Sequence, residues 1–290
     1  MKKIIYIISL GRSGSTILDI ILGNGKDILS CGELNRYAIS QGKPGYWRLF
    51  KDSPTFLFWD KINTKLAKHF YDNHINYLLL NELIKKYEYH TAFFTRSKAK
   101  RKDFKEYSYF LLSLYQILFE TIDNSIIVDS SKYPARALRL AEIAPPHYQL
   151  GFIYLQRDPK GVVTSFAKKE VKQPSKSYFK ANLYYLLVSL LCKYTVYQLK
   201  KKKYPIVEIR YEDLITRPVE IISNIQDKLD LNLTNAIEKV KRDETLQIGP
   251  LFEGNRLRLQ GNLKLITKNS TYPKNIKNFL TQLINLVVYR

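Results

Sequence analysis

Short apolar runs along the chain alternate with stretches whose apolar residues recur every three or four positions. Each run has the length of a buried strand and is too short to span a bilayer. Strands that alternate with one-sided helices predict a parallel β-sheet covered by helices on both faces. The strand-like runs are at 4–8, 27–30, 125–128, 149–155 and 206–210, and helical stretches are at 17–22, 135–144 and 218–229, with another that begins at Pro159.

The region 41–122 interrupts this alternation. It is rich in aromatic residues and has helical stretches at about 60–88 and 104–122. Nothing in it has the spacing of a catalytic motif, and its histidines lack the spacing of a metal site. We therefore expect a single domain, 1–290, with a helical insertion at 41–122 that walls a substrate pocket. Most aromatic side chains of the insertion are expected in its core, and a last helix at about 273–289 is expected to pack as a cap.

A loop of small residues joins the first strand to the first helix. Glycines let the backbone turn so that successive N–H groups point at one anion, and the start of the helix adds partial positive charge. Three hydroxyl groups and one arginine supply further donors. This strand–loop–helix order predicts a phosphate cradle, although a plain glycine turn would also fit. The residues of the predicted cradle are Gly11, Arg12, Ser13, Gly14, Ser15 and Thr16.

The cradle does not fit the motif of the nucleoside triphosphatases. That motif needs a glycine, four residues, and then Gly-Lys-Ser or Gly-Lys-Thr. At the corresponding distance from Gly11 stands Thr16 instead, and the loop has no lysine. A kinase-like phosphotransferase that uses ATP and magnesium is therefore the second choice.

Polar residues that suit an anion also stand at the ends of later strands, where open α/β sheets place their ligands. Lys132 follows the strand at 125–128 and is a candidate anion contact. Arg157 follows the strand at 149–155, and Ser165 lies in the next helix, so these two side chains can close on one phosphate. An ion pair with a neighbouring acid is the alternative for Arg157.

Two further segments are candidates for the same site. Glu33, directly after Gly32, could face the cradle, although an ordinary surface carboxylate fits this position as well. The loop 254–262 is rich in glycine and arginine, a composition that suits close approach of the backbone to an anion. Its alternative is a solvated surface loop.

The chain is strongly basic, with 47 lysines and arginines against 26 acidic residues and a formal net charge of +21. Such a charge favours polyanions, anionic membrane surfaces or acidic substrates. Because the charge is spread out, a lysine-rich composition explains it equally well. The two cysteines, Cys31 and Cys192, do not form the pattern of a disulfide scaffold. We expect a soluble, cytoplasmic protein, because the N-terminus lacks a signal-peptide pattern and the apolar stretch 181–192, either core or interface, is too short to span a bilayer.

Taken together, these motifs resemble the sulfotransferases that use 3′-phosphoadenosine 5′-phosphosulfate (PAPS), the bacterial and carbohydrate-type members in particular. Gly11–Thr16 resembles the 5′-phosphosulfate loop of that family, and Arg157–Ser165 resembles its 3′-phosphate motif. The motifs occur in family order over nearly the whole chain, whereas the region 41–122 resembles nothing that we can name. Further similar stretches are 129–132, 211–218 and 254–258.

The resemblance implies a P-loop-like fold and a set of contacts to the two ends of PAPS. The backbone amides of the cradle, with the hydroxyls of Ser15 and Thr16, would hold the 5′-phosphate. Arg12 would lie beside the bridging oxygen. Arg157 and Ser165 would bind the 3′-phosphate.

The resemblance also implies where the adenine and the reacting groups lie. Tyr211 would lie near the adenine, and Arg256 or Arg258 would close a loop over the co-substrate. Lys132, with Arg12, would offset charge that grows on the leaving phosphate. Glu33 resembles the general base of some members. Many cytosolic members use a histidine instead, and no histidine here stands in a matching motif.

We therefore expect an enzyme that moves the sulfuryl group of PAPS in line to a hydroxyl or amine, without a metal. A small molecule, a carbohydrate, a lipid or a peptide tyrosine fits as the acceptor, and no nucleic-acid partner is expected. Contact with an anionic membrane surface and the oligomeric state stay open. Besides the kinase-like reading, the alternative is a non-enzymatic polyanion-binding protein, which would show strongly salt-dependent binding to any nucleic acid.

Overall fold

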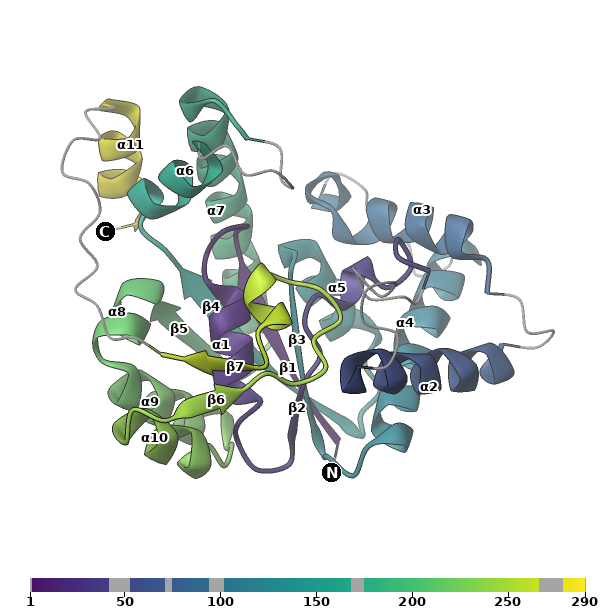
Figure 1. Ribbon diagram of the computed structural model, residues 1–290. Coiled ribbons are helices and arrows are strands. Elements are labelled where there is room, and N and C mark those ends of the chain that lie inside the picture. Colours follow the sequence, from purple (N-terminus) through teal and green to yellow (C-terminus); the bar gives the residue numbers. More distant parts are fainter. Residues whose placement is uncertain are drawn as a thin grey trace.

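A five-stranded parallel sheet lies at the centre of the protein (Figure 1). The computed structural model describes residues 2–41, 53–70, 75–93, 102–167, 175–265 and 279–289. The strands follow the order β2-β3-β1-β4-β5, and every neighbouring pair is parallel. The predicted α/β class with a parallel sheet is confirmed. The strands are β1 (Lys2–Ser9), β2 (Ile28–Ser30), β3 (Ile126–Lys132), β4 (Tyr148–Gln156) and β5 (Ile206–Arg210).

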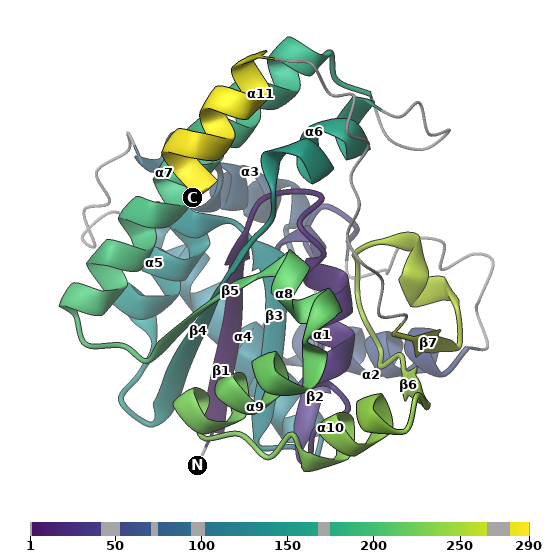
Figure 2. The same cartoon turned by 90° about the vertical axis from the view of Figure 1, so that its left-hand side faces the viewer.

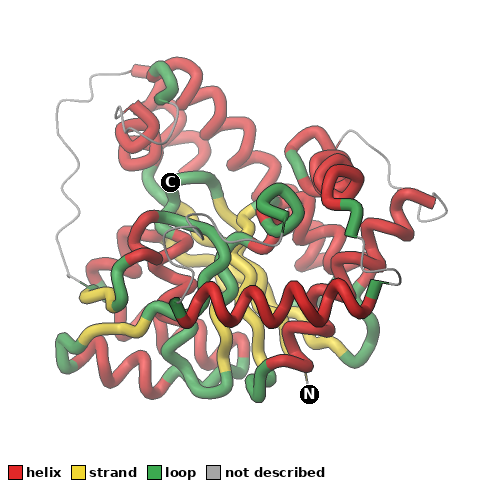
Figure 3. The backbone as a smooth tube through the Cα atoms, turned by 45° about the vertical axis from the view of Figure 1, so that its right-hand side comes forward, coloured by secondary structure: helices red, strands yellow, loops and turns green. Residues whose placement is uncertain are grey.

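Both faces of the sheet are buried because its central strands are apolar on both sides. In β1, Ile4, Tyr6 and Ile8 belong to one hydrophobic core, whereas Ile5 and Ile7 belong to the other, as the two-residue period of a strand requires. Figures 2 and 3 show helices in front of the sheet and behind it. One face is covered by α1 (Ser15–Leu22), α9 (Pro218–Leu229) and α10 (Thr234–Lys241), and the other by α4 (Lys102–Thr121), α5 (Pro134–Ile143) and α7 (Tyr178–Lys201).

Short elements gather around the carboxyl ends of the strands and beside α1. Among them, α8 begins at Tyr211, directly where β5 ends, because the chain turns there from an apolar strand into an acidic first helical turn. The short elements are the helices α6 (Pro159–Ala167), α8 (Tyr211–Thr216) and α11 (Phe279–Ile284), the π-helix η6 (Asn285–Tyr289), the 3-10 helices η1 (Leu34–Arg36), η4 (His90–Phe93) and η5 (Arg256–Leu259), and the hairpin β6 (Thr245–Gln247) and β7 (Asn262–Lys264). The expected last helix at 273–289 is helical from Phe279 on, and 273–278 lie outside the described residues.

The region 41–122 is helical where it is described, on the right in Figure 1. The stretch expected at 60–88 is two helices, α2 (Pro54–His69) and α3 (Tyr77–Glu88). The second begins where the Asn76 side chain accepts a hydrogen bond of 3.0 Å from the N–H of Leu79. Residues 42–52, 71–74 and 94–101 of the insertion lie outside the described residues. The aromatic residues Trp59, Tyr107, Phe110 and Tyr115 are buried, as predicted for the core of the insertion.

Buried charges join the insertion to the sheet. Arg136 of α5 is only 1% exposed and forms ion pairs with Glu88 of α3 and with Asp129 of β3, the latter at 3.0 Å. The hydroxyls of Tyr107 and Tyr115, both from α4, donate to Glu88 and Asp129 at 3.0 and 2.6 Å. Burial raises the pKa of Glu88, and the guanidinium of Arg136 acts against that rise. This network explains why β3 runs to Lys132 instead of ending at Val128: its polar residues are buried with partners that lie far away in the sequence.

We predict that Arg136→Met destabilises the protein by about 3–5 kcal/mol, because two buried carboxylates then lose their counter-charge. Urea unfolding would measure the effect. Arg217→Met is the matched control, since Arg217 also pairs with two carboxylates, Asp213 and Glu220, but on the surface. The control should unfold close to the wild type. Equal effects of the two substitutions would contradict the role of the buried network.

Candidate active site

A cavity of about 600 Å³ opens at the carboxyl ends of the strands. Its wall combines the loop after β1, the end of β3, the residue after β4 and the start of α8, which are far apart in the sequence. The structure therefore brings most of the predicted site residues together. Those that line the cavity are Gly11, Arg12, Ser13, Gly14, Ser15, Thr16, Glu33, Lys132, Arg157, Ser165 and Tyr211.

The predicted cradle is a tight turn into α1. Arg12 and Gly14 both have positive φ, 67° and 93°. A Cβ atom at Gly14 would lie 2.3 Å from the ring of Tyr211. Only glycine therefore allows both this backbone conformation and the close approach of the tyrosine.

The interior of the cradle matches an anion. The first N–H groups of a helix have no acceptor within the helix, and the first residues of α1, Ser15, Thr16 and Ile17, line the cavity. The hydroxyl of Ser13 is fully buried and has no hydrogen-bond partner among the described residues. A buried hydroxyl without a partner costs free energy, and a phosphate oxygen in the cradle would accept its hydrogen bond.

Arg157 is anchored against the cradle and against Tyr211. One guanidinium nitrogen donates a 2.7 Å hydrogen bond to the carbonyl of Arg12, and the guanidinium carbon lies 4.4 Å from the centre of the Tyr211 ring. The hydroxyl of Tyr185 donates to the Arg157 carbonyl at 2.8 Å. These contacts hold the arginine in the cavity wall, on the side where Ser165 of α6 also lines the cavity.

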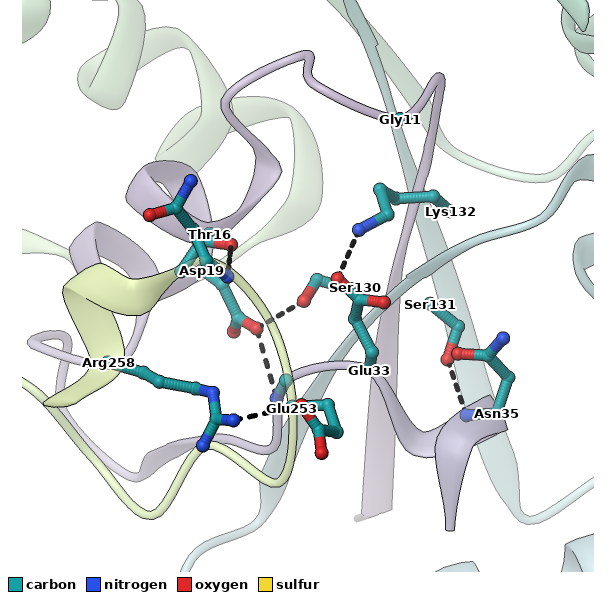
Figure 4. Close-up of polar contacts among 12 residues, drawn as sticks. Gly11, Thr16, Asp19, Glu33, Asn35, Ser130, Ser131, Lys132, Glu253 and Arg258 are labelled. Atoms are coloured by element: carbon teal, nitrogen blue, oxygen red, sulfur yellow. Dashed lines mark hydrogen bonds and ion pairs between the residues drawn. The ribbon is translucent and has the colours of Figure 1, made fainter. Parts of the chain in front are cut away.

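Glu33 and Lys132 form an ion pair in the cavity (Figure 4). The backbone has a positive φ at or beside both members of the pair: 74° at Gly32, which precedes Glu33, and 72° at Lys132 itself. Non-glycine residues with positive φ are strained and persist where the surrounding structure enforces them. The pair therefore places one carboxylate and one ammonium group at a fixed point beside the cradle.

Asp19, a residue that the sequence did not single out, holds the turn that carries Glu33. Its carboxylate accepts hydrogen bonds from the N–H of Gly32 at 3.1 Å and from the hydroxyl of Ser130 at 2.6 Å. The side chain is fully buried in α1. Burial raises the pKa of Asp19 to about 7, against the lowering effect of its hydrogen bonds. The periodicity of α1 could not predict this role of Asp19, because the partners of its carboxylate come from the segment after β2 and from β3.

The raised pKa of Asp19 predicts a pH dependence of stability. Between pH 4 and 7 the folded protein keeps a proton that the unfolded chain has released, so stability is lost as the pH rises through 7. The shift from 3.8 to about 7 corresponds to about 4 kcal/mol. Asp19→Asn, which does not ionise, should therefore gain stability over the wild type as the pH rises from 4 to 8, measured by urea unfolding at each pH. A constant difference over this range would contradict the prediction.

The sequence did not single out several further residues of the wall, among them His90, Lys176 and Tyr184. The hydroxyl of Tyr184 accepts a 3.1 Å hydrogen bond from the N–H of Gly11. The ammonium of Lys176 lies 5.7 Å from the centres of the Tyr184 and Phe166 rings. Spacing along the chain gave no signal for these residues, since only the packing of the insertion and α7 brings them to the cradle.

His90 is the histidine that faces the cavity among the described residues. Its ring lies 5.4 Å from that of Tyr133 and 6.0 Å from that of Tyr184. Burial lowers its pKa, so the imidazole is neutral at pH 7. Its buried Nδ1 has no hydrogen-bond partner within the described part of the chain.

Arg256 and Arg258 belong to η5, in the loop that is expected to close over the co-substrate. Neither arginine lines the cavity. Arg258 forms a 2.9 Å ion pair with Glu253. The loop contributes Gly254, Asn255 and Leu257 to the wall, and the N–H of Asn255 donates to the Thr16 hydroxyl at 3.1 Å. The loop thus contacts the cradle through its backbone.

The sequence profile described as "Sulfotransferase family" matches residues 5–235. The chain belongs to the sulfotransferase family. The match includes both motifs that suggested this family, the cradle and Arg157–Ser165. No curated protein matches the chain.

Solved sulfotransferases have the same fold. The sulfotransferase domain from the curacin biosynthetic pathway is similar over 99% of this chain and 97% of its own, with a TM-score of 0.53 and 17% sequence identity. The sulfotransferase domain of an olefin synthase from Synechococcus PCC 7002 covers 100% of this chain and 95% of its own, with a TM-score of 0.49 and 18% identity. At this identity the first likeness supports the fold of this sulfotransferase, and the second is too distant to add to it.

Proposed function

We propose that this sulfotransferase takes a sulfuryl group from PAPS and passes it to a hydroxyl or amine of an acceptor. The observation that carries the proposal is the arrangement of two anion-binding groups around one cavity. The cradle suits a 5′-phosphosulfate, and Arg157 with Ser165 suits a 3′-phosphate. The ring of Tyr211, between the two, suits a flat base. PAPS supplies a sulfuryl group attached to a phosphate that can leave.

The cations of the cavity would stabilise charge during transfer. Arg12 stands in the cradle, and its guanidinium carbon lies 5.8 Å from the centre of the Phe166 ring. Lys132 is held in the cavity wall by its ion pair with Glu33. In a cavity that partly excludes water, fixed positive charges lower the cost of negative charge that appears on the departing phosphate.

Glu33 is our choice for the group that removes the acceptor proton. Its carboxylate is held beside the cradle by the ion pair with Lys132, at a place where it can accept a proton from an acceptor hydroxyl. His90 is the second candidate, because it is neutral at pH 7 and its Nδ1 has no hydrogen-bond partner among the described residues. We propose that the acceptor, a small molecule, carbohydrate or lipid, enters on the side walled by His90 and the insertion.

Calorimetric titration with 3′-phosphoadenosine 5′-phosphate, AMP, and ATP with magnesium tests the donor. We predict that the first binds at least about tenfold more tightly than AMP, because each charged hydrogen bond to the 3′-phosphate contributes about 1.5–3 kcal/mol. Arg157→Ala should remove this preference. Arg210→Ala is the matched control, since Arg210 also stacks on a tyrosine, at 5.0 Å from the Tyr289 ring, and does not line the cavity.

Other results of the titration would favour other functions for the protein. Equal and weak binding of all three nucleotides would indicate a protein that only attracts anions. Tight, magnesium-dependent binding of ATP with hydrolysis would favour the kinase-like alternative. Loss of the preference in Arg210→Ala would mean that the effect of Arg157 is indirect.

Two substitutions by glutamine distinguish the candidate bases. Glu33→Gln should leave binding of 3′-phosphoadenosine 5′-phosphate unchanged and lower turnover about 100-fold, the usual contribution of a general base. His90→Gln should leave both unchanged. Turnover is measured as transfer from labelled PAPS to a panel of simple phenols and alcohols. The reverse pattern, with activity of the wild type that falls only below pH 6.5, would assign the base to His90 because its pKa is lowered by burial.

A further inference from the structure

One side of α7 carries a continuous row of exposed apolar side chains, here termed the α7 stripe. Neighbours in the stripe are three or four positions apart, so all its members lie on one side of the helix. Each is between 47% and 67% exposed. From the first to the last member the stripe is about 27 Å long, at 1.5 Å per residue. The α7 stripe consists of Phe179, Leu183, Leu187, Leu190, Tyr194 and Tyr197.

The opposite side of α7 packs into the protein. Tyr185, Val188, Cys192 and Leu199 belong to the hydrophobic core beneath the helix. The helix is therefore apolar on almost its whole circumference, a composition that is typical of a helix buried on all sides. The exposed stripe accordingly indicates a surface that is covered when the protein functions.

A second exposed apolar surface lies beside α7, on α11 and η6. The hydroxyl of Thr281 donates a 3.0 Å hydrogen bond to Asn182, and the ammonium of Lys193 donates one of 2.5 Å to the carbonyl of Val288. Figures 1 and 2 show the two helical segments next to each other. The exposed apolar residues of this second segment are Phe279, Leu283, Leu286 and Val287, which are 44% to 78% exposed.

The sequence around both segments is rich in positive charge, although Lys200 near the end of α7 pairs with Glu208. Residues 171–207 contain eight lysines and no acidic residue, and residues 254–290 contain seven lysines and arginines and no acidic residue. Lys180 and Lys201 are exposed on α7, near the two ends of the stripe. A second copy of the chain would bring the same positive charge to the contact, so electrostatic repulsion opposes self-association through this surface. A negatively charged partner is favoured.

We propose that the α7 stripe and the neighbouring face of α11 and η6 dock on the surface of an anionic membrane. Apolar and tyrosine side chains would enter the boundary between headgroups and acyl chains, while the lysines contact the acidic headgroups. A helix that lies flat needs no more than one apolar side for this contact. None of the described helices is long and apolar enough to cross a membrane, and docking in the interface does not require one.

Docking would place the membrane next to the active site. Tyr184 comes from the same helix as the α7 stripe and bonds to the first glycine of the cradle. Lys176, two residues before α7 begins, lines the cavity. An acceptor that is carried by the membrane would then reach the cavity without leaving the surface. The docking itself does not depend on the identity of the sulfuryl donor.

Flotation with lipid vesicles tests the docking surface. The wild type is mixed with vesicles of phosphatidylcholine alone, or with vesicles that also contain about 30 mol% phosphatidylglycerol, since acidic lipid supplies the attraction. We expect binding to the acidic vesicles that weakens with salt. Leu183→Ser/Leu190→Ser should weaken it about tenfold or more, because two leucines no longer enter the apolar layer. Leu57→Ser/Leu78→Ser is the matched control, since Leu57 and Leu78 are 58% and 77% exposed on α2 and α3, outside the stripe.

Binding of 3′-phosphoadenosine 5′-phosphate and the thermal midpoint are measured for both double variants, so that a loss of folding is not mistaken for a loss of docking. Unchanged vesicle binding in Leu183→Ser/Leu190→Ser would overturn the proposal and attribute binding to net charge. The proposal would also be overturned if the control variant lost as much vesicle binding as the stripe variant. Absence of vesicle binding, together with a dimer in light scattering that the stripe variant abolishes, would assign the surface to a second copy instead. Failure of the nucleotide to bind any of these proteins would count against the proposed donor and leave the docking result intact.

Discussion

A positive charge buried away from water must be surrounded by negative charge, and Arg136 imposes this condition on the fold. Glu88 brings the insertion to the arginine, and Asp129 brings β3. Asp129 also accepts a 2.8 Å hydrogen bond from the N–H of Ser131, whose hydroxyl accepts one of 3.0 Å from the N–H of Asn35. The charge network therefore extends to the segment that follows Glu33. The insertion is thus coupled to the site through the sheet and not only through the wall of the cavity.

The backbone of the cavity wall is strained at two of its cationic residues. Arg12 and Lys132 have positive φ although both carry side chains. Each conformation is held from outside, the first by Arg157, which bonds to the Arg12 carbonyl, and the second by the ion pair with Glu33. Strain of this kind fixes the direction of a side chain more firmly than a relaxed loop does. It suits a reaction in which correctly placed charge, and not covalent chemistry, provides most of the rate.

The sequence was sufficient to predict those parts of the structure that depend on neighbouring residues. Apolar runs of strand length and the glycines of the cradle predicted the sheet and the turn into α1, because each depends on neighbouring residues alone. The sequence was insufficient where a side chain is positioned by a partner that is distant along the chain. The burial of Asp129 depends on Arg136 and Tyr115, and the place of His90 depends on how the insertion packs. The ion pair of Arg258 with Glu253 could not be predicted, because it is set by the fold of one short loop.

The positions of the charges in the structure change the interpretation of the net charge of +21. Composition alone leaves a general affinity for polyanions as good an explanation as any specific site. The structure separates two groups of cations. Arg12, Lys132, Arg157 and Lys176 converge on one cavity, where each lies against an aromatic ring or an ion-pair partner and so keeps a defined direction. The exposed lysines of α7, which are Lys180, Lys193, Lys200 and Lys201, instead lie on a helix with exposed apolar side chains. A nucleic-acid surface would use the second group of charges but would leave the apolar residues among them in water, whereas an acidic lipid surface uses both, and for this reason the physical chemistry of α7 favours the membrane.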